Sequence, residues 1–544
     1  MTPQPASFAA FRHTTFRALW LSSVVSNTGG MIQIVGASWL MTMLTSSQSM
    51  VALVQSSITL PLMLVSVGAG VLADNSDRRL VMLVSQIFML VVSVILAGLA
   101  YANLLTPWLV LSFTFLIGCG MALNNPSWQS SFSDFVPRQD LPSAVSMNAM
   151  GMNITRSVGP ALGGAIVSAF GVAAAFVINA LTYVTIIAAL LSWRPEPNHQ
   201  RLPRERFHSA LVAGLRYLML SPDLLSVNFR GFLYGFAAIA IQALLPLIAR
   251  DRLDGGPLVF GILLGAFGAG AVIGALNAAR LRTHLSNEIL VRICFLLFAA
   301  ASVVIAFSAS IVLTVVTLCI AGACWLNVMS LLNVTVQMSV PRWVLGRMIS
   351  LFMTWIFGGM ALGGWVWGGI AENFGLTTSL LLAAVVLVLG GLWGLRFPLL
   401  EYGATNLDPT NRFNEPLLRL DLTRRSGPIK IMVDYEIAQD DVQEFLMVMA
   451  ERRRTRIRDG ARRWTLLRDL EDPDIWTESY QFPTWTEYVR HHERRTVADF
   501  EIAKRLTALH RGPMPLRVHR MIERQTVEPE DDMPRTVIRP EDVH

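Results

Sequence analysis

Charge is scarce in this sequence of 544 residues: only 15% are Asp, Glu, Lys or Arg, and 53% are hydrophobic. Soluble domains average about 25% charged residues, so most of this chain does not have the composition of a soluble protein. The charge that is present gathers in residues 401–544, whereas the long apolar runs lie in residues 1–400. We therefore expect a membrane protein with several spans and a polar domain after the last of them.

Patterned cysteines and nucleotide-binding motifs are also lacking. The four cysteines, Cys119, Cys294, Cys319 and Cys324, all fall inside apolar runs. Their spacing fits neither a set of metal ligands nor a disulfide framework, so we expect no metal and no cofactor. No GxxxxGK segment occurs, which argues against an ATP-driven pump. We attribute the net charge of +6 to arginines that orient the spans, and expect no nucleic-acid partner.

A run of about 20 apolar residues can cross a bilayer as a helix, and this chain contains twelve such runs. They lie near residues 18–44, 51–73, 80–103, 107–133, 143–169, 172–193, 224–249, 256–280, 288–309, 311–338, 347–371 and 376–398. Residues 1–193 and 224–398 each hold six runs, which predicts two six-helix halves. In the linker 194–223, the segment 207–220 predicts an amphipathic helix on the cytoplasmic membrane surface or a plain tether.

Arginines fall almost entirely in alternate loops, those after the second, fourth, sixth, eighth and tenth runs. They are Arg78, Arg79, Arg138, Arg194, Arg201, Arg204, Arg206, Arg280, Arg282, Arg342 and Arg347. The loop after the seventh run is the exception, because it contains Arg250 and Arg252 beside Asp251 and Asp254. Since basic residues mark cytoplasmic loops, this asymmetry predicts that both termini lie in the cytoplasm.

An internal repeat supports the division into halves. Gly118, the segment 136–138 (Val-Pro-Arg) and Gly159 return about 204 residues later as Gly322, the segment 340–342 and Gly363. Repeated halves enclosing a binding site near the middle of the bilayer are typical of secondary transporters.

A short charged turn joins the second and third runs. Taken alone, it predicts a hairpin that fixes topology. Its spacing, with Gly70, Asp74, Arg78 and Arg79, resembles the loop motif of the major facilitator superfamily. In that family the Asp pairs with a neighbouring helix end and latches the cytoplasmic gate. The resemblance therefore implies a gating role for these four residues. Asp77 stands where the family often has glycine, and its role stays open.

The resemblance implies an all-α membrane protein with the twelve-helix major facilitator fold. In the fifth run, Gly159, Pro160, Gly163 and Gly164 also resemble a motif of the superfamily's exporters, although the two upstream glycines are Ser146 and Thr155 here. Ordinary close helix packing through small residues is the alternative for this segment.

Arg156 lies about thirteen residues into the fifth run, roughly 20 Å from its cytoplasmic start. A cation near the middle of the bilayer is costly and normally faces a cavity or a partner. The residue predicts either a site for an anionic or carbonyl-rich substrate or a structural hydrogen-bonding hub. Other polar residues in the runs are candidates for the same cavity or for helix–helix hydrogen bonds: Asn27, Gln33, Asn124, Asn125, Gln242, Asn327 and Asn333.

The coupling ion is not evident. No Asp or Glu lies deep in a run, and Asp134 and Glu372 lie near run ends. The fourth-run arginine of proton-driven drug exporters is missing from residues 113–120. A proton is one candidate for the coupling ion, without an identified carrier.

The polar domain begins after a linker, residues 399–428. Residues 429–523 show the order β-α-β-β-α-β, with one long helix expected over 484–510, and predict a ferredoxin-like α+β domain. Residues 524–544 are proline-rich and acidic and are expected to be disordered. Such a tail, with the segments 452–461 and 491–499, resembles that of the bacterial transmembrane secretion effectors, relatives of the enterobactin-exporter type. His491 and His492 are expected to face solvent; a catalytic role is the alternative.

These observations predict a non-enzymatic secondary transporter of the bacterial inner membrane. It would export a small organic molecule, such as a siderophore-like compound or a drug, by alternating access. An importer of a small anionic solute, and a membrane-tethered sensor or enzyme acting through its tail, are the alternatives. The expected partners are the substrate and the lipid bilayer, with the chain a monomer or a weak dimer through its C-terminal domain.

Overall fold

The computed structural model describes residues 9–75, 77–137, 139–193, 207–341, 343–399, 407, 418–420, 422–423, 425–513 and 515–523, although not the side chains of 66–67, 69–75, 133 and 207–211. The chain forms two compact units. The first contains residues 1–204, 226–336 and 349–401, and the second contains 205–225, 337–348 and 402–544.

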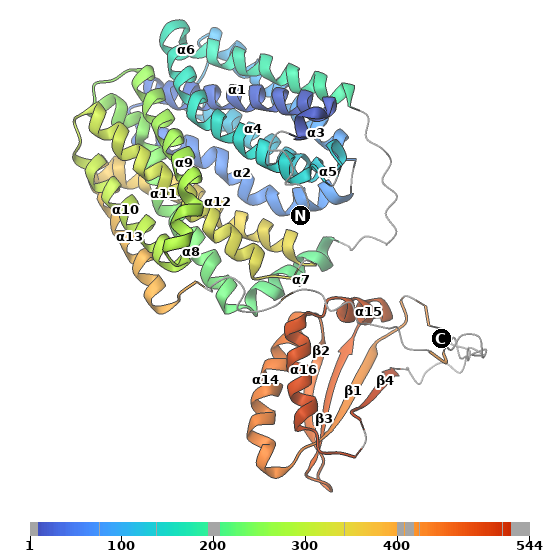
Figure 1. Ribbon diagram of the computed structural model, residues 1–544. Coiled ribbons are helices and arrows are strands. Elements are labelled where there is room, and N and C mark those ends of the chain that lie inside the picture. The colour runs from blue at the N-terminus through green and yellow to red at the C-terminus, as the bar shows by residue number, and fades with distance from the viewer. Residues whose placement is uncertain are drawn as a thin grey trace. The chain divides into compact units, whose positions relative to one another are not determined.

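The N-terminal half of the first unit is helical (Figure 1). A 3-10 turn, η1 (Ala9–Arg12), precedes α1 (Thr14–Leu44), α2 (Gln48–Asn75), α3 (Arg78–Tyr101), α4 (Pro107–Ser130), α5 (Phe132–Phe135) and α6 (Leu141–Ser192). Helix α6 has 52 residues and breaks at Gly171, which has a φ of 82° that side chains other than hydrogen rarely tolerate. Two of the predicted runs, 143–169 and 172–193, are therefore the two limbs of α6.

The C-terminal half follows the same plan. It contains α8 (Pro222–Leu247), the π-helical η2 (Ile248–Arg252), α9 (Pro257–His284), α10 (Asn287–Phe307), α11 (Ile311–Met338), α12 (Leu345–Phe374) and α13 (Leu376–Arg396). Among the described residues, ten helices are long and apolar enough to cross a membrane. Helix α1 is 31 residues long but is not one of the ten, since polar residues interrupt it.

Local sequence sets where the helices begin. Asp77 caps α3, because its carboxylate accepts hydrogen bonds from the backbone N–H of Arg79 (2.9 Å) and of Leu80 (3.4 Å). Thr106 caps α4 in the same way, and Pro107 occupies the first turn, where no N–H is needed. The role of Asp77, which the sequence left open, is thus that of a helix cap.

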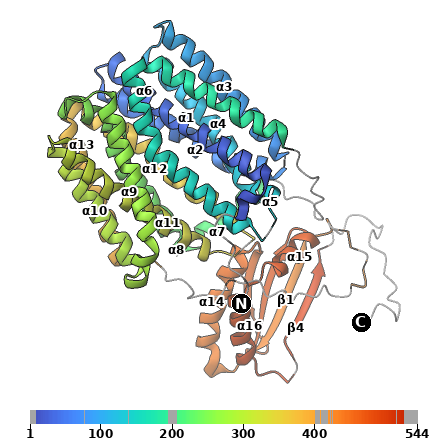
Figure 2. The ribbon, with the colours of Figure 1, turned by 45° about the horizontal axis from the view of Figure 1, so that its top comes forward.

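Successive long helices run in opposite directions, so the start of α3, with Arg78 and Arg79, and the end of α9, with Arg280 and Arg282, share one end of the bundle, here called the basic end. The turns after α1, η2 and α12 lie at the opposite end. Within the halves, α1 packs on α6, α2 on α4, and α10 on α13. Helices α6 and α9 join the two halves (Figure 2).

The second unit contains α7 (Phe207–Met219) and a sheet with helices. Its elements are β1 (Ile429–Glu436), η3 (Gln439–Asp441), α14 (Val442–Arg458), β2 (Arg462–Arg468), β3 (Ile475–Phe482), α15 (Trp485–Glu493), α16 (Val497–Leu509) and β4 (Arg517–Ile522). The strand order is β2-β3-β1-β4 with antiparallel neighbours, and α14 packs beside α16 against one face (Figures 1 and 2).

The prediction of one long helix over 484–510 is wrong. Residues 494–496 separate α15 from α16, because Thr496 and Asp499 form a capping box that starts a new helix. The prediction that His491 faces solvent is also wrong. Its side chain is only 1% exposed and lies among Arg456, Tyr480 and Phe482.

Candidate functional site

A cavity of about 410 Å³ lies within the N-terminal half. Helices α1, α2, α3, α4 and both limbs of α6 line it, and Phe357 of α12 reaches it from the other half. Its lining residues lie in the middle of α1, at 23–37, and in the parts of α3 (82–89), α4 (114–129) and the second limb of α6 (183–190) that are nearer the basic end. The cavity therefore extends from the middle of the bundle toward that end.

Five of the predicted substrate-binding residues line the cavity: Asn27, Gln33, Asn124, Asn125 and Arg156. Arg156 projects from the first limb of α6 and is exposed to the cavity. Its guanidinium has no hydrogen-bond or ion-pair partner in the part of the chain that the structure describes, so the alternative role of a structural hub finds no contact there. A cation inside a membrane span is costly, and the five N–H donors of this guanidinium have no partner among the described residues.

Two of the polar side chains are held in fixed orientations. Gln33 accepts hydrogen bonds from Ser93 Oγ (3.0 Å) and from Asn179 Nδ2, which also donates to Ser93 Oγ (3.2 Å). Asn124 Oδ1 accepts a hydrogen bond from Gln86 Nε2 at 3.2 Å. A ligand would therefore meet preset polar groups on α1 and α4.

Asn27 and Asn125 are bound less firmly. Among the described residues, Asn27 donates only to Ser23 Oγ, one turn earlier in the same helix, at 3.1 Å. Asn125 is exposed and has no partner among the residues that the structure describes. The amide of Asn125 and the guanidinium of Arg156 are thus two polar groups of the cavity that have no partner among the described residues.

Sequence reasoning missed several lining residues. Five methionines line the cavity, Met31, Met82, Met89, Met121 and Met152, as do Gln86 and Tyr183. Methionine side chains adapt to ligands of different shape, so they suit a site for a bulky organic molecule. A concentration of methionine on several runs was the available signal, because the chain contains 24 of them.

The three candidates from the C-terminal half do not line this cavity: Gln242, Asn327 and Asn333. Asn327 is buried and donates to Ala323 O (2.9 Å) and Gly274 O (3.4 Å), which ties α11 to α9. That is the helix–helix alternative considered for these residues.

The glycines of the fifth-run motif face two different neighbours. A Cβ added to Gly159 would lie 2.7 Å from Met31 Cβ, and one added to Gly163 would lie 3.0 Å from Ile32 Cα, both in α1. A Cβ added to Gly164 would lie 2.5 Å from Pro257 O, in α9 of the other half. Pro160, inside α6, comes so close to α9 that its carbonyl would meet a Cβ on Gly261 at 2.5 Å.

At the basic end, Arg78 and Arg79 cap helix ends of the N-terminal half. Arg78 Nη1 donates to Ser130 O (2.8 Å) at the end of α4 and to Asp134 Oδ2 (3.0 Å) in α5. Arg79 donates to Leu190 O and Leu191 O, each at 2.8 Å, at the end of α6. Cations are favourable at carbonyl ends of helices. The side chains of Gly70 and Asp74 lie outside the described residues, so their gating role stays a prediction.

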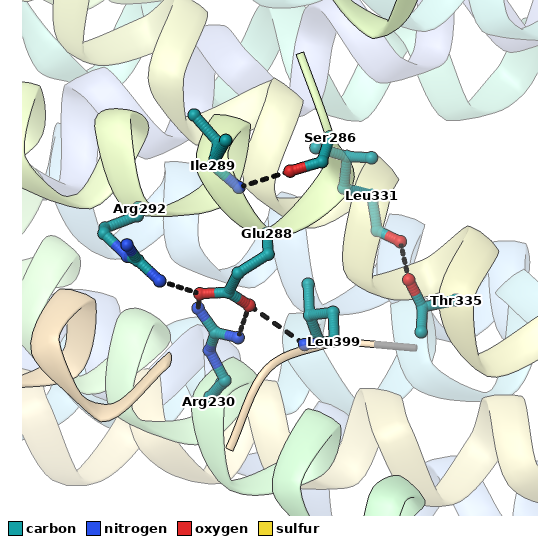
Figure 3. A network of polar contacts seen from close by, with 8 residues as sticks. All are labelled: Arg230, Ser286, Glu288, Ile289, Arg292, Leu331, Thr335 and Leu399. Carbon is teal, nitrogen blue, oxygen red and sulfur yellow. Dashed lines mark hydrogen bonds and ion pairs between the residues drawn. The ribbon is translucent and has the colours of Figure 1, made fainter. Parts of the chain in front are cut away.

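A buried ion pair in the C-terminal half was not predicted (Figure 3). Arg230 of α8 contacts Glu288 in the first turn of α10, with 2.6 Å between Nη1 and Oε2. Glu288 also accepts from Arg292 Nη2 (3.3 Å) and from the backbone N–H of Leu399 (3.0 Å). The network joins the starts of α8 and α10 to the end of the last span. Its signals in the sequence were the charged residues of two apolar runs: Arg230, Glu288 and Arg292.

In the second unit, α7 and the loop after α11 touch the C-terminal domain. The Arg458 guanidinium lies 4.9 Å from the centre of the Tyr217 ring, and that of Arg494 lies 4.2 Å from the Trp343 ring. Tyr217 and Trp343 meet edge to face at 5.8 Å. These contacts attach the domain to the linker between the two halves.

The domain's interior holds charge but little free volume. Burial lowers the pKa of His491 well below its ordinary value, and the charge of Arg456, which lies 2.6 Å from His491 Nε2, lowers it further. A cavity of only about 20 Å³ lies beside these groups. That volume holds about one water molecule, so it offers no room for an organic substrate.

Comparison with known proteins agrees with this architecture. The profile of the family described as "transmembrane secretion effector" matches residues 5–527. The chain is 28% identical over 338 residues to the enterobactin exporter EntS of Escherichia coli, covering 59% of this chain and 79% of that protein. It is 26% identical over 209 residues to macrolide efflux protein A of Enterococcus faecalis, covering 38% of this chain and 65% of that protein.

Solved structures share the fold. A bacterial homologue of the human lysosomal transporter Spinster, inward-facing and unoccupied, superposes with a TM-score of 0.58 at 14% identity, covering 70% of this chain and 96% of that one. The nucleoside transporter NupG gives a TM-score of 0.58 at 14% identity, covering 70% and 98%. The profile match covers nearly the whole sequence. This multi-pass bacterial membrane protein therefore belongs to the transmembrane secretion effector family of the major facilitator superfamily.

Proposed function

We propose that this protein exports a small organic anion across the bacterial inner membrane by alternating access. The single observation that carries the proposal is the unpartnered guanidinium of Arg156, among the described residues, in the cavity of about 410 Å³. Sites for drug-sized ligands have volumes of about 300–1,000 Å³ and combine apolar walls with a few placed polar groups. A siderophore-like compound or an acidic drug has the size and charge for this site.

The fold supports twelve crossings. Within the described ranges, ten helices meet the length and hydropathy required, α1 is long enough to add one more, and the two limbs of α6 add another. With an even number of crossings, both termini lie on the side of the basic end, which the positive-inside rule assigns to the cytoplasm. The cavity extends toward that side, as uptake of a substrate from the cytoplasm requires.

Export is favoured over import by the relatives, an enterobactin exporter and macrolide efflux proteins. Arg156 would bind the anionic group, while Gln33, Asn124, Asn125 and the methionines would contact the rest of the molecule. Gly70, Asp74, Arg78 and Arg79 would control the cytoplasmic gate. A proton stays a candidate coupling ion.

The C-terminal domain would be an accessory module. Its order of elements and its sheet order support a ferredoxin-like arrangement. Its contacts with Tyr217 and Trp343 support a role in holding the linker between the halves. If a chain lacking residues 399–544 still transports, the module is accessory; complete loss of transport with normal membrane insertion would show that transport requires the module.

Transport into inside-out vesicles tests the proposal, with a panel of catecholate siderophores, acidic drugs and uncharged compounds of similar size. We expect an anionic compound to be transported, and Arg156→Gln to raise its KM by about tenfold or more, since hydrogen bonds to charged groups contribute about 1.5–3 kcal/mol. Arg156→Lys should retain part of the affinity.

The control is Arg292→Gln, which removes an arginine that does not line the cavity. An Arg156→Gln protein with unchanged KM for every transported anion would remove the site assignment. Transport only in right-side-out vesicles would assign the protein as an importer.

A further inference from the structure

The turn between α1 and α2 is held by two charged residues of the other half, at the end of the bundle opposite the basic end. Arg250 Nη1 donates to Thr42 O in the last turn of α1 at 2.6 Å. Glu372 Oε2 accepts from Ser47 Oγ at 2.7 Å and from Ser49 N at 2.8 Å, at the start of α2. Both residues belong to the C-terminal half, so these contacts bridge the halves.

Each charge matches the helix end that it touches. The last carbonyls of α1 and the first N–H groups of α2 have no partners within their own helices. A guanidinium is favourable at the carbonyl end of a helix and a carboxylate at the N–H end. Arg250 and Glu372 thus satisfy two neighbouring helix ends of opposite polarity, rather than pairing with each other.

Arg250 is one of the two arginines that break the orientation pattern of the sequence. It lies in η2, whose π-helical turn differs from the regular end of an α-helix. Its Nε and Nη2 atoms contact Asp251 at 2.6 and 3.2 Å, while Arg252 donates to Thr377 of α13. The segment is therefore anchored in its own half, and Nη1 of Arg250 is the group that crosses to α1.

Close packing continues inward from these contacts. Ser56 Oγ of α2 donates to Ala361 O of α12 at 2.7 Å, and a Cβ added to Gly364 would collide with Ser56 Oγ. A Cβ added to Gly368 would lie 2.7 Å from Ala52 Cβ. Helices α2 and α12 are thus in close contact between the cavity and the opposite end.

We propose that Glu372 and Arg250 form a latch that closes the outer end of the transport path and must release before substrate can leave there. The inference rests on the proposed alternating-access function. The orientation pattern places most arginines in loops at the basic end, and Arg250 departs from it. We explain this departure by the contact that Arg250 makes with the end of α1.

The test measures accessibility behind the latch. Ser56→Cys is a conservative replacement at the contact between α2 and α12. Its reaction with a membrane-impermeant maleimide is followed from the outer side in intact cells. The chain that keeps Ser56 gives the background labelling. Glu372→Ala and Arg250→Ala should each raise the labelling rate by about two- to tenfold, the range expected for one charge–helix-end contact. Asp254→Asn, an exposed change in the same turn, is the matched control and should leave the rate unchanged.

A charge exchange discriminates the latch from an ordinary ion pair. The double variant Glu372→Arg, Arg250→Glu keeps one positive and one negative residue at these positions but gives each helix end the wrong sign, so the labelling rate should stay high. Restored protection by this double variant, or unchanged labelling in both single variants, overturns the inference. All variants are compared at equal amounts of monodisperse protein. Labelling that depends on the latch in a chain that transports none of the panel would refute the proposed function and leave the latch intact.

Discussion

The guanidinium of Arg230 donates two hydrogen bonds to the carboxylate of Glu288, with Nη1 2.6 Å from Oε2 and Nη2 3.2 Å from Oε1 (Figure 3). Arg230 is fully buried, so the pair joins α8 to α10 where water does not reach the arginine. Gly394 of α13 permits the approach, because a Cβ there would collide with Glu288 Oε1. The last span therefore closes over the pair.

We expect Glu288→Gln to destabilise the protein more than any change at a neighbouring surface charge. Breaking a buried pair leaves one charge unsatisfied and costs about 3–5 kcal/mol, whereas replacing both partners by apolar residues is often much milder. Thermal unfolding in detergent is followed by size-exclusion chromatography. The unfolding temperature of Glu288→Gln should be well below that of the double variant Arg230→Met, Glu288→Leu.

Arg292→Gln is the control for this pair. Arg292 is more exposed than Arg230, and an accessible pair four residues apart in a helix contributes only about 0.3–0.5 kcal/mol. If Glu288→Gln unfolds no earlier than Arg292→Gln, the buried pair does not hold these helices together.

Arg230 shows why sequence reasoning found the spans but missed this contact. A segment of apolar residues is still predicted as a span when it contains a single arginine. Its partner, Glu288, lies 58 positions further along the chain. Nothing local says that the two face each other. The same limit applies to Asn327. The sequence does not distinguish a polar residue that faces a cavity from one that, as here, contacts a carbonyl of α9. Rotation about each helix axis decides this, and only packing fixes it.

Helix breaks and helix starts were easier to predict from the sequence than contacts between side chains. The runs at 143–169 and 172–193 meet at Gly171, where the structure breaks α6. In the C-terminal domain, the helix expected over 484–510 ends early because the Thr496–Asp499 capping box competes with continuation. A threonine followed three residues later by an acidic residue is a recognisable start signal, and it was available in the sequence.

We expect Gly164→Ala to impair transport. The added methyl group would meet Pro257 O and the backbone of Gly261 in α9, and backbone atoms cannot move away as a flexible side chain can. The substitution should therefore separate the halves at this crossing, reducing transport several-fold in the vesicle assay. Gly98→Ala is the matched control, because nothing lies within 4 Å of a Cβ there. Equal transport by both variants would show that the close approach of α6 and α9 is not required.

The buried Asp459 gives the C-terminal domain a pH-dependent stability. Burial raises the pKa of this carboxyl to about 6, although the neighbouring Arg458 opposes the shift. A raised folded-state pKa means that the folded domain binds the proton more tightly, so this contribution is complete at low pH and is lost as the pH rises through 6. Between pH 4 and pH 7, the free energy of unfolding of the domain should fall by roughly 2 kcal/mol through this group.

Asp459→Asn removes this titration. Hydrogen exchange of the full-length protein should show the stability of the variant's domain rising relative to the wild type by that amount between pH 4 and 7. A constant difference across the range would place the pKa of Asp459 near its ordinary value.

The contact between the C-terminal domain and the linker makes the last prediction. Tyr217 is 1% exposed between Arg458 and Trp343, so Tyr217→Leu removes a cation–π contact and an edge-to-face ring pair together. Such contacts contribute about 0.5–2 kcal/mol each, so hydrogen exchange in residues 212–219 should accelerate by about tenfold in the intact protein. Arg453→Gln is the control, because Arg453 stacks on Trp464 inside the domain and leaves α7 untouched. Equal exchange in residues 212–219 of both variants would mean that the domain does not hold the linker.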